Sequence, residues 1–287
     1  MSWLRLDVHS ATALAVAMLV VCGVAYRYAG RRARFVAAAS FEIAVVCALF
    51  ALWQVANSLT RGHTTGGVSR GEWLWHAERV LHLTSEVSVQ DLIIHHPWLV
   101  RSANYYYDTA HLTLMLVFLV WLWLRHRDRY PMVRNTIAAF TAMSLLIQMV
   151  AVAPPRLITG TGLIDTAALY GQSVYAAFGS GIADEYAAMP SIHVGWAVLI
   201  SVAVVVSSTS RWRWLALAHG VLTIFVVVAT ANHYWLDGIA ACALLVPAWL
   251  IARGLERLRL RMRSEVGEGE LADAVPESAQ IQQGAFS

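Results

Sequence analysis

Three short polar segments interrupt an otherwise apolar chain, and their residue types could transfer a phosphoryl group. They are Ala153-Pro154-Pro155-Arg156, Met189-Pro190-Ser191-Ile192-His193 and Asn232-His233-Tyr234-Trp235-Leu236-Asp237. His233 and Asp237 are one helical turn apart, so the carboxylate can orient one ring nitrogen and leave the other as a nucleophile. A second histidine can act as proton donor. The predicted catalytic residues are therefore His233, His193 and Asp237.

Residues beside these histidines could hold a phosphate group. Ser191 follows Pro190 at an expected helix start, where free backbone N–H groups attract anions. Arg156 adds a permanent positive charge in a planar fork that suits phosphate oxygens. Asn232 offers a neutral donor next to the expected nucleophile. The predicted phosphate-binding residues are Arg156, Ser191 and Asn232.

Membrane-spanning helices must position these residues. The chain is 58% hydrophobic and only 14% charged, with a mean hydropathy of +0.56, which is typical of a membrane protein. Apolar runs of about 20 residues are long enough to cross the hydrocarbon core. They lie near residues 9–26, 36–58, 109–124, 135–153, 192–208, 214–231 and 236–252. We therefore expect an all-α integral membrane protein with about seven transmembrane helices.

The arginines predict the orientation of these spans. All 21 basic residues are arginine, and most fall in four clusters at 27–34, 125–134, 211–213 and 253–263. The positive-inside rule places all four clusters, and the C-terminus, in the cytoplasm. The three polar segments then share the extracytoplasmic face, because two crossings of about 20 residues separate His193 from His233. We expect a multi-pass cell-membrane protein with an extracytoplasmic active site.

Two of these motifs resemble those of a known family. Pro190-Ser191-x-His193 and His233-x-x-x-Asp237 resemble the second and third signature motifs of the type 2 phosphatidic acid phosphatase superfamily. Their expanded forms, with Ala-Pro-Pro-Arg156 upstream, look most like the branch containing fungal inositol phosphorylceramide synthase and its bacterial relatives. Further patterns similar to that branch are Tyr107-x-x-x-His111 and Gly162-Leu163-Ile164-Asp165-Thr166.

The resemblance implies a six-helix core and a mechanism. His233 would form a phosphohistidine intermediate, Asp237 would orient it, and His193 would protonate the leaving group. Ser191 and Arg156 would bind phosphate. The resemblance implies neither a metal nor another cofactor.

The apolar runs and arginine clusters, together with this resemblance over roughly residues 100–245, predict a domain organisation. Residues 1–35 would form the first transmembrane helix and its arginine cluster, and 36–253 the catalytic membrane domain, with its motifs within 100–245. Residues 254–287 would form a cytoplasmic basic helix and an acidic tail, for which the composition predicts disorder from residue 264.

The outer segment 59–108 has apolar residues at helical spacing and is expected to lie on the membrane surface. They are Trp73, Leu74, Val80, Leu81 and Leu83.

Two usual phosphate ligands of the superfamily are missing. The first motif normally begins with lysine, which this chain lacks, and Val227 stands where the third motif usually has arginine. Glycine in the second motif is replaced by Ile192. Arg156 could work with Arg101 or another outer arginine. Neutral donors such as Tyr105, Tyr107 or Asn232 could also hold the phosphate oxygens. Ionisable groups at a span entrance are also functional candidates, so the predicted pocket residues are Tyr107, Asp108, His111, Arg101 and Asp165.

The acceptor and the protein class remain open at this point. A lipid phosphate or phosphoinositide-type donor in the bilayer could pass its phosphoryl or phospho-headgroup to a polyol such as inositol, which makes an inositolphosphotransferase-like enzyme. Transfer to water would make a lipid phosphate or polyprenyl diphosphate phosphatase. Eleven histidines also allow a haem-binding protein, and the missing ligands allow a non-catalytic lipid-binding protein. No nucleic-acid motif is present, so no nucleic-acid partner is expected.

Overall fold

The computed structural model describes residues 7–60, 64–172 and 185–273. This part of the chain is helical and contains no β-strand, only an isolated bridge between Val152 and Ala187. The predicted all-α class is therefore confirmed.

Within the described residues, seven long helices form the body of the protein, and every predicted apolar run falls on one of them. They are α1 (Val8–Tyr26), α2 (Arg31–Thr60), α5 (Pro97–Arg125), α6 (Tyr130–Gln148), α9 (Ile192–Ser207), α10 (Ala216–Ala229) and α11 (Trp235–Asp273). The shorter helices connect them. These are α3 (Gly67–Val80), α4 (Glu86–Ile94), α7 (Thr166–Leu169) and the 3-10 turns η1 (Pro155–Leu157) and η2 (Arg211–Leu215).

Four of the described helices are long and apolar enough to cross a membrane by themselves. They cover Val8–Tyr26, Arg31–Val55, Arg211–Ala229 and Trp235–Met262. Helix α5 makes a fifth span if its two halves, which meet at a bend of 46°, are counted together. The apolar helix α9 has 16 residues and spans about 24 Å, less than the hydrocarbon thickness of about 30 Å. The count of seven spans therefore stays a prediction.

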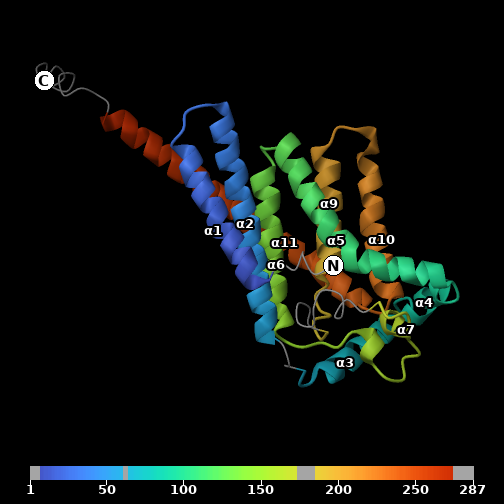
Figure 1. The fold of residues 1–287 in the computed structure, drawn as a ribbon. Helices are drawn as coiled ribbons and strands as arrows, with labels where there is room; N and C mark the ends of the chain where they lie inside the picture. The colour runs from blue at the N-terminus through green and yellow to red at the C-terminus, as the bar shows by residue number, and fades with distance from the viewer. Residues whose placement is uncertain (1–6, 61–63, 173–184, 274–287) are drawn as a thin grey trace, which may run out of the picture.

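Packing follows the pattern expected in a bilayer. Helices α1 and α2 form an antiparallel hairpin (Figure 1). Helix α2 contacts α6 through an ion pair of 2.6 Å between Glu42 and Arg134. Helix α11 packs on α6 and α9, and α10 packs on α9 and α4. Outward-facing residues such as Val20 and Val221 are apolar and more than half exposed, while polar Ser144 is fully buried. Lipid tails suit such an apolar surface.

The arginine clusters and the catalytic motifs lie at opposite ends of the bundle. Figure 1 shows the connections α1–α2, α5–α6 and α9–α10 at one end, and these connections carry or adjoin three of the arginine clusters. Helices α3, α4 and α7 cover the other end, where α9 begins and α10 gives way to α11. The arginine clusters and the polar motifs are thus separated along the bundle, and the cytoplasmic side of the clusters stays a prediction.

Two expectations concern the flanking segments. Helix α11 is described through Asp273, and residues 274–287 lie outside the described part, so the disorder expected from residue 264 stays a prediction. In the outer segment, α3 is a helix, as its apolar spacing predicts. Leu74 packs inward and is 3% exposed, whereas Trp73 is 67% exposed. Contact of α3 with the membrane surface stays a prediction.

Candidate active site

Ser191 begins α9 and links it to α11. Its side-chain hydroxyl accepts a hydrogen bond of 3.3 Å from the N–H of Val194, as an N-cap residue does. Its own N–H donates to the carbonyl oxygen of Asp237 at 3.2 Å. Ser191 is fully buried, so its hydroxyl is fixed at the helix start that the sequence predicts.

The turn after α10 aims His233 into the same region. The N–H of Asn232 donates to the carbonyl of Val227 (3.0 Å) and that of Ala231 to the carbonyl of Val228 (2.9 Å), which together form a Schellman motif. Ala231 has φ of +54°, a left-handed conformation that costs a non-glycine residue about 1 kcal/mol. His233 thus lies on a turn before α11, although the sequence spacing suggests a helical position.

The ring of His233 is held so that one nitrogen is available for chemistry. Its Nδ1 lies 2.8 Å from the carbonyl oxygen of Ala188 and 3.3 Å from Oδ2 of Asp237. Both oxygens accept, so Nδ1 carries the hydrogen and Nε2 carries a lone pair. Nε2 lies 3.4 Å from Nδ1 of His193, and the two rings are 5.6 Å apart. The contact between His233 and Asp237 that the spacing predicts is present.

Asp237 also fixes the first turn of α11. Its Oδ2 accepts a hydrogen bond of 2.9 Å from the N–H of Tyr234, and the residue is fully buried. Anchored in this way, the carboxylate can restrain the ring of His233 without moving itself. A carboxylate at a helix N-terminus is also favoured by the helix dipole.

The Ala188 carbonyl is a contributor that the sequence pattern missed. The segment 186–190 is held by backbone bonds to Val152 and by Gln148, whose side-chain amide donates to the carbonyls of Ala187 (3.2 Å) and Pro190 (3.0 Å). A backbone acceptor has no side-chain signature. The only available signal was a glutamine at the end of an otherwise apolar run.

Arg156 lies beside the nucleophile through Asn232. Its Nε donates to Oδ1 of Asn232 at 3.1 Å, and its backbone N–H donates to the carbonyl of Ala231 at 3.0 Å. Nη1 bonds to Oδ2 of Asp165 at 3.0 Å, and Nη2 lies 3.6 Å from Oε1 of Glu185. Arg156 therefore lies beside the expected nucleophile with two carboxylates against its guanidinium, and its role as a phosphate ligand stays a prediction.

Helix α5 brings one of its expected residues to the histidines. The ring of Tyr107 is 4.5 Å from that of His193 and 6.3 Å from that of His233. Asp108 has one buried oxygen with no hydrogen-bond partner among the described atoms. The side chain of His111 lies outside the described part, so its expected role stays a prediction.

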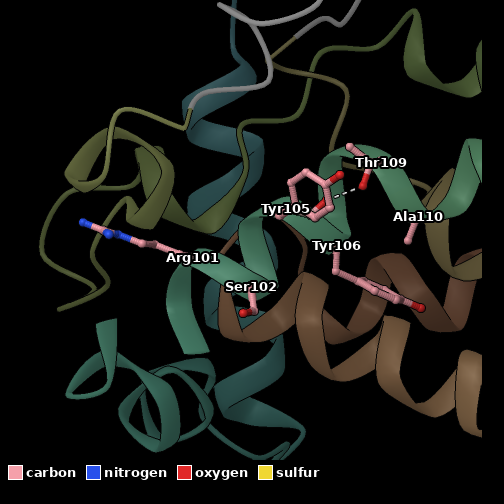
Figure 2. Close-up of a pocket in the computed structure, with 6 residues that line it drawn as sticks. All are labelled: Arg101, Ser102, Tyr105, Tyr106, Thr109 and Ala110. Atoms are coloured by element: carbon pink, nitrogen blue, oxygen red, sulfur yellow. Dashed lines mark hydrogen bonds between the residues drawn. The ribbon is translucent and has the colours of Figure 1, made fainter. Parts of the chain in front are cut away.

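Arg101 occupies a different place. It lies over the ring of Tyr170 at 5.1 Å and lines an open pocket of about 420 Å³ on α5. Figure 2 shows the lining residues, which are Arg101, Ser102, Tyr105, Tyr106, Thr109 and Ala110. Tyr106 points toward α10, where its hydroxyl is 2.6 Å from Nδ1 of His219. Among the described contacts, none joins Arg101 or Tyr105 to His193 or His233.

Helix α3 packs against the turn that carries His233 and Tyr234. The hydroxyl of Tyr234 donates to the carbonyl of Ala153 at 3.1 Å, and burial together with nearby carboxylates raises the pKa of this phenol, so it stays a donor. A Cβ at Gly71 would lie 2.7 Å from that carbonyl oxygen and 2.9 Å from the Tyr234 hydroxyl. The close approach of α3 to Tyr234 and Ala153 therefore requires glycine here.

The comparisons place this site in a family. The model of the PAP2 superfamily matches residues 72–251, which is more than half of the chain and includes all three polar segments. The chain therefore belongs to the PAP2 superfamily, as the motifs indicate. No curated protein and no solved structure matches it significantly. Members of this superfamily are typically phosphatases or phosphotransferases. The α1–α2 hairpin lies outside the matched range.

Proposed function

We propose that this protein transfers a phosphoryl group from a lipid-linked phosphate through a phosphohistidine at His233. The observation that carries the proposal is the 3.4 Å approach of His193 to Nε2 of His233, whose Nδ1 is held by Ala188 and Asp237. This arrangement supports a nucleophile with a fixed tautomer and an adjacent proton donor.

The two chemical steps balance with these residues. Nε2 of His233 attacks phosphorus, the N–P bond forms, the bond to the leaving oxygen breaks, and His193 gives its proton to that oxygen. In the second step His193 takes a proton from water or an alcohol. The oxygen of that acceptor bonds to phosphorus as the N–P bond breaks.

Phosphate oxygens would be held by Arg156, Asn232 and the hydroxyl of Ser191. Arg156 is 4% exposed, and charge-assisted hydrogen bonds are strong at such a buried position. In the structure Asp165 and Glu185 contact its guanidinium. An incoming phosphate would compete with them, so the carboxylates keep the arginine oriented before substrate arrives. Tyr107, whose ring lies 4.5 Å from that of His193, would border the leaving-group side.

We propose that the site faces the extracytoplasmic side of the cell membrane and that the C-terminus is cytoplasmic. The separation between arginine clusters and catalytic turns along the bundle supports this orientation. Donors would then reach the site from the outer leaflet. A fusion reporter at the C-terminus that is active only in the periplasm or outside the cell would contradict it.

The acceptor of the phosphoryl group decides between two candidate activities, a phosphotransferase and a phosphatase. The Met-Pro-Ser-x-His and Asn-His-Tyr-x-x-Asp forms, with Ala-Pro-Pro-Arg upstream, favour an inositolphosphotransferase-like enzyme that uses a polyol or lipid acceptor. The second candidate is a lipid phosphate or polyprenyl diphosphate phosphatase, because the same catalytic residues serve a water acceptor. Haem ligation by this histidine pair is disfavoured, because ligation does not require the Ser191, Arg156 and Asp237 side chains that accompany the histidines.

Product analysis tests the proposal. Purified protein in lipid nanodiscs would be given labelled phosphatidic acid, phosphatidylinositol or polyprenyl diphosphate, each with and without inositol. We expect label in a new inositol-containing product, and none with His233→Ala. Release of free phosphate alone would establish the phosphatase. No turnover of any donor by the folded protein would contradict both forms and leave a non-catalytic lipid-binding protein.

A further inference from the structure

Two fully buried glutamates lie near the start of α11. Glu78 in α3 and Glu86 at the first turn of α4 are both 0% exposed. Oε1 of Glu78 accepts a hydrogen bond of 2.7 Å from the N–H of Leu236, which lies between His233 and Asp237. A side chain from the outer segment thus contacts the same helical turn that Asp237 caps.

The charges at this position do not balance if both glutamates are ionised. Arg79 is 2.6 Å from Oε2 of Glu86 and 3.9 Å from Oε2 of Glu78. Asp237 adds a third buried carboxyl group nearby. Burying several carboxylates beside one guanidinium is costly, and a group in this position takes up a proton instead.

The hydrogen bonds point to where that proton lies. Oε2 of Glu78 and Oε1 of Glu86 are buried and have no donor among the described atoms. The two side chains are nevertheless hydrogen-bonding neighbours. One proton on Glu78, donated to Glu86, satisfies both oxygens. The described residues contain no cluster of three His, Cys, Asp or Glu side chains that could hold a metal ion.

We propose that Glu78 is a positioning residue that works as a neutral carboxylic acid. It donates a hydrogen bond to Glu86 and accepts one from the N–H of Leu236. In this form it holds the first turn of α11, and with it Asp237 and the ring of His233. The activity part of this inference rests on the function proposed above, while the positioning part does not.

The pH dependence follows from the groups around Glu78. Burial, its hydrogen bond to Glu86 and the negative charges of Glu86 and Asp237 raise the pKa of Glu78 to about 9, and the Leu236 N–H opposes the shift. Arg79 on its own helix is the neighbouring cation, and Tyr234 on the α11 side stays neutral. The folded state therefore keeps a proton that the unfolded chain loses near pH 4.5. Stability falls as pH rises from about 4.5 to about 9.

The test compares Glu78→Gln, Glu78→Ala and Glu72→Gln in the full-length protein. Glutamine copies the protonated acid, because it accepts from Leu236 and donates to Glu86 but cannot ionise. We expect E78Q to retain activity at neutral pH, to lose the alkaline decline of kcat near pH 9, and to exceed the wild type in Tm by a margin that grows with pH. Glu72 is exposed on the same helix, so E72Q should keep the wild-type pH profile.

Hydrogen exchange provides a readout that needs no substrate. Loss of one hydrogen bond in E78A should speed exchange of the amides at 234–238 by about tenfold, and E78Q should restore protection. Unchanged exchange of these amides in a folded E78A variant would overturn the proposal. A folded E78Q variant whose Tm depends on pH as the wild-type Tm does would also overturn it. If E78A does not fold, E78Q alone decides. A wild type without turnover would instead refute the proposed function and leave these arms intact.

Discussion

Nδ1 of His233 lies closer to the carbonyl oxygen of Ala188, at 2.8 Å, than to the carboxylate of Asp237, at 3.3 Å. The tautomer of the expected nucleophile is thus set by a backbone acceptor from the segment before α9, with the carboxylate as a second partner. In the neutral ring this places the hydrogen on Nδ1 and the lone pair on Nε2, which lies 3.4 Å from Nδ1 of His193. Residues that hold this backbone segment should therefore influence catalysis without touching substrate.

Gln148 is the clearest such residue. Changing it to leucine removes the donor to the carbonyls of half-buried Ala187 and buried Pro190. We expect a loss of about 2 kcal/mol in the free energy of unfolding. We also expect a fall in kcat of up to about 10²-fold with little change in KM, because His233 loses its alignment.

The matched control for Gln148 lies one turn earlier in α6. The hydroxyl of Ser144 is buried and has no hydrogen-bond partner among the described atoms. Ser144→Ala should therefore leave stability and kcat at or above the wild-type level. Equal effects of the two substitutions would show that any change in this helix disturbs the site.

Removing His193 should affect substrates according to their leaving groups. A positioned general acid contributes about 10²- to 10⁴-fold when the leaving alkoxide needs a proton. His193→Ala should show this loss for a lipid phosphate ester and a much smaller loss for a nitrophenyl phosphate. His76→Ala, an exposed change on α3, should alter neither rate. An equal loss for both esters in H193A would assign this residue to another step.

The two candidate arginines can be separated by conservative substitution. Arg156→Lys keeps the charge but loses the fork that contacts Asn232 and Asp165. We expect kcat/KM to fall by about 10- to 100-fold, the cost of a charge-assisted hydrogen bond. Arg101→Lys should stay within about twofold, because Arg101 lines the separate pocket in Figure 2. The opposite ranking would assign phosphate binding to Arg101.

Gly71 tests whether α3 must pack tightly against the catalytic turn. A methyl group there would lie 2.7 Å from the Ala153 carbonyl oxygen and 2.8 Å from Cδ1 of Ile158. We expect Gly71→Ala to destabilise the protein by about 1–3 kcal/mol and to lower activity with it. Gly254→Ala meets nothing within 4 Å in α11 and should instead stabilise by up to about 1 kcal/mol. Thermal unfolding in one detergent measures both.

Apolar periodicity predicted the elements well because helix position depends mainly on burial in lipid. Each predicted run became a helix, and the start of α9 at Ile192 follows from the capping residue Ser191. The convergence of His193, His233 and Arg156 was also predictable, since chain direction reverses with each crossing.

Features that depend on tertiary packing were not predictable. The Ala188 carbonyl is a backbone atom, so no residue type marks its role. Glu78 and Glu86 look like ordinary surface charges in a polar segment, and only the structure shows that both are fully buried. Counting apolar runs likewise does not confirm seven spans, because α5 bends by 46° and α9 has only 16 residues.

Trapping the covalent intermediate tests the central claim most directly. The protein would be incubated with a donor labelled with ³²P, quenched in alkali and digested, and the labelled peptide would be identified by mass spectrometry. We predict acid-labile, alkali-stable phosphate on His233, accumulation of this species in the wild type, and none in His233→Ala. Label on another residue, or full turnover by His233→Ala, would contradict the account.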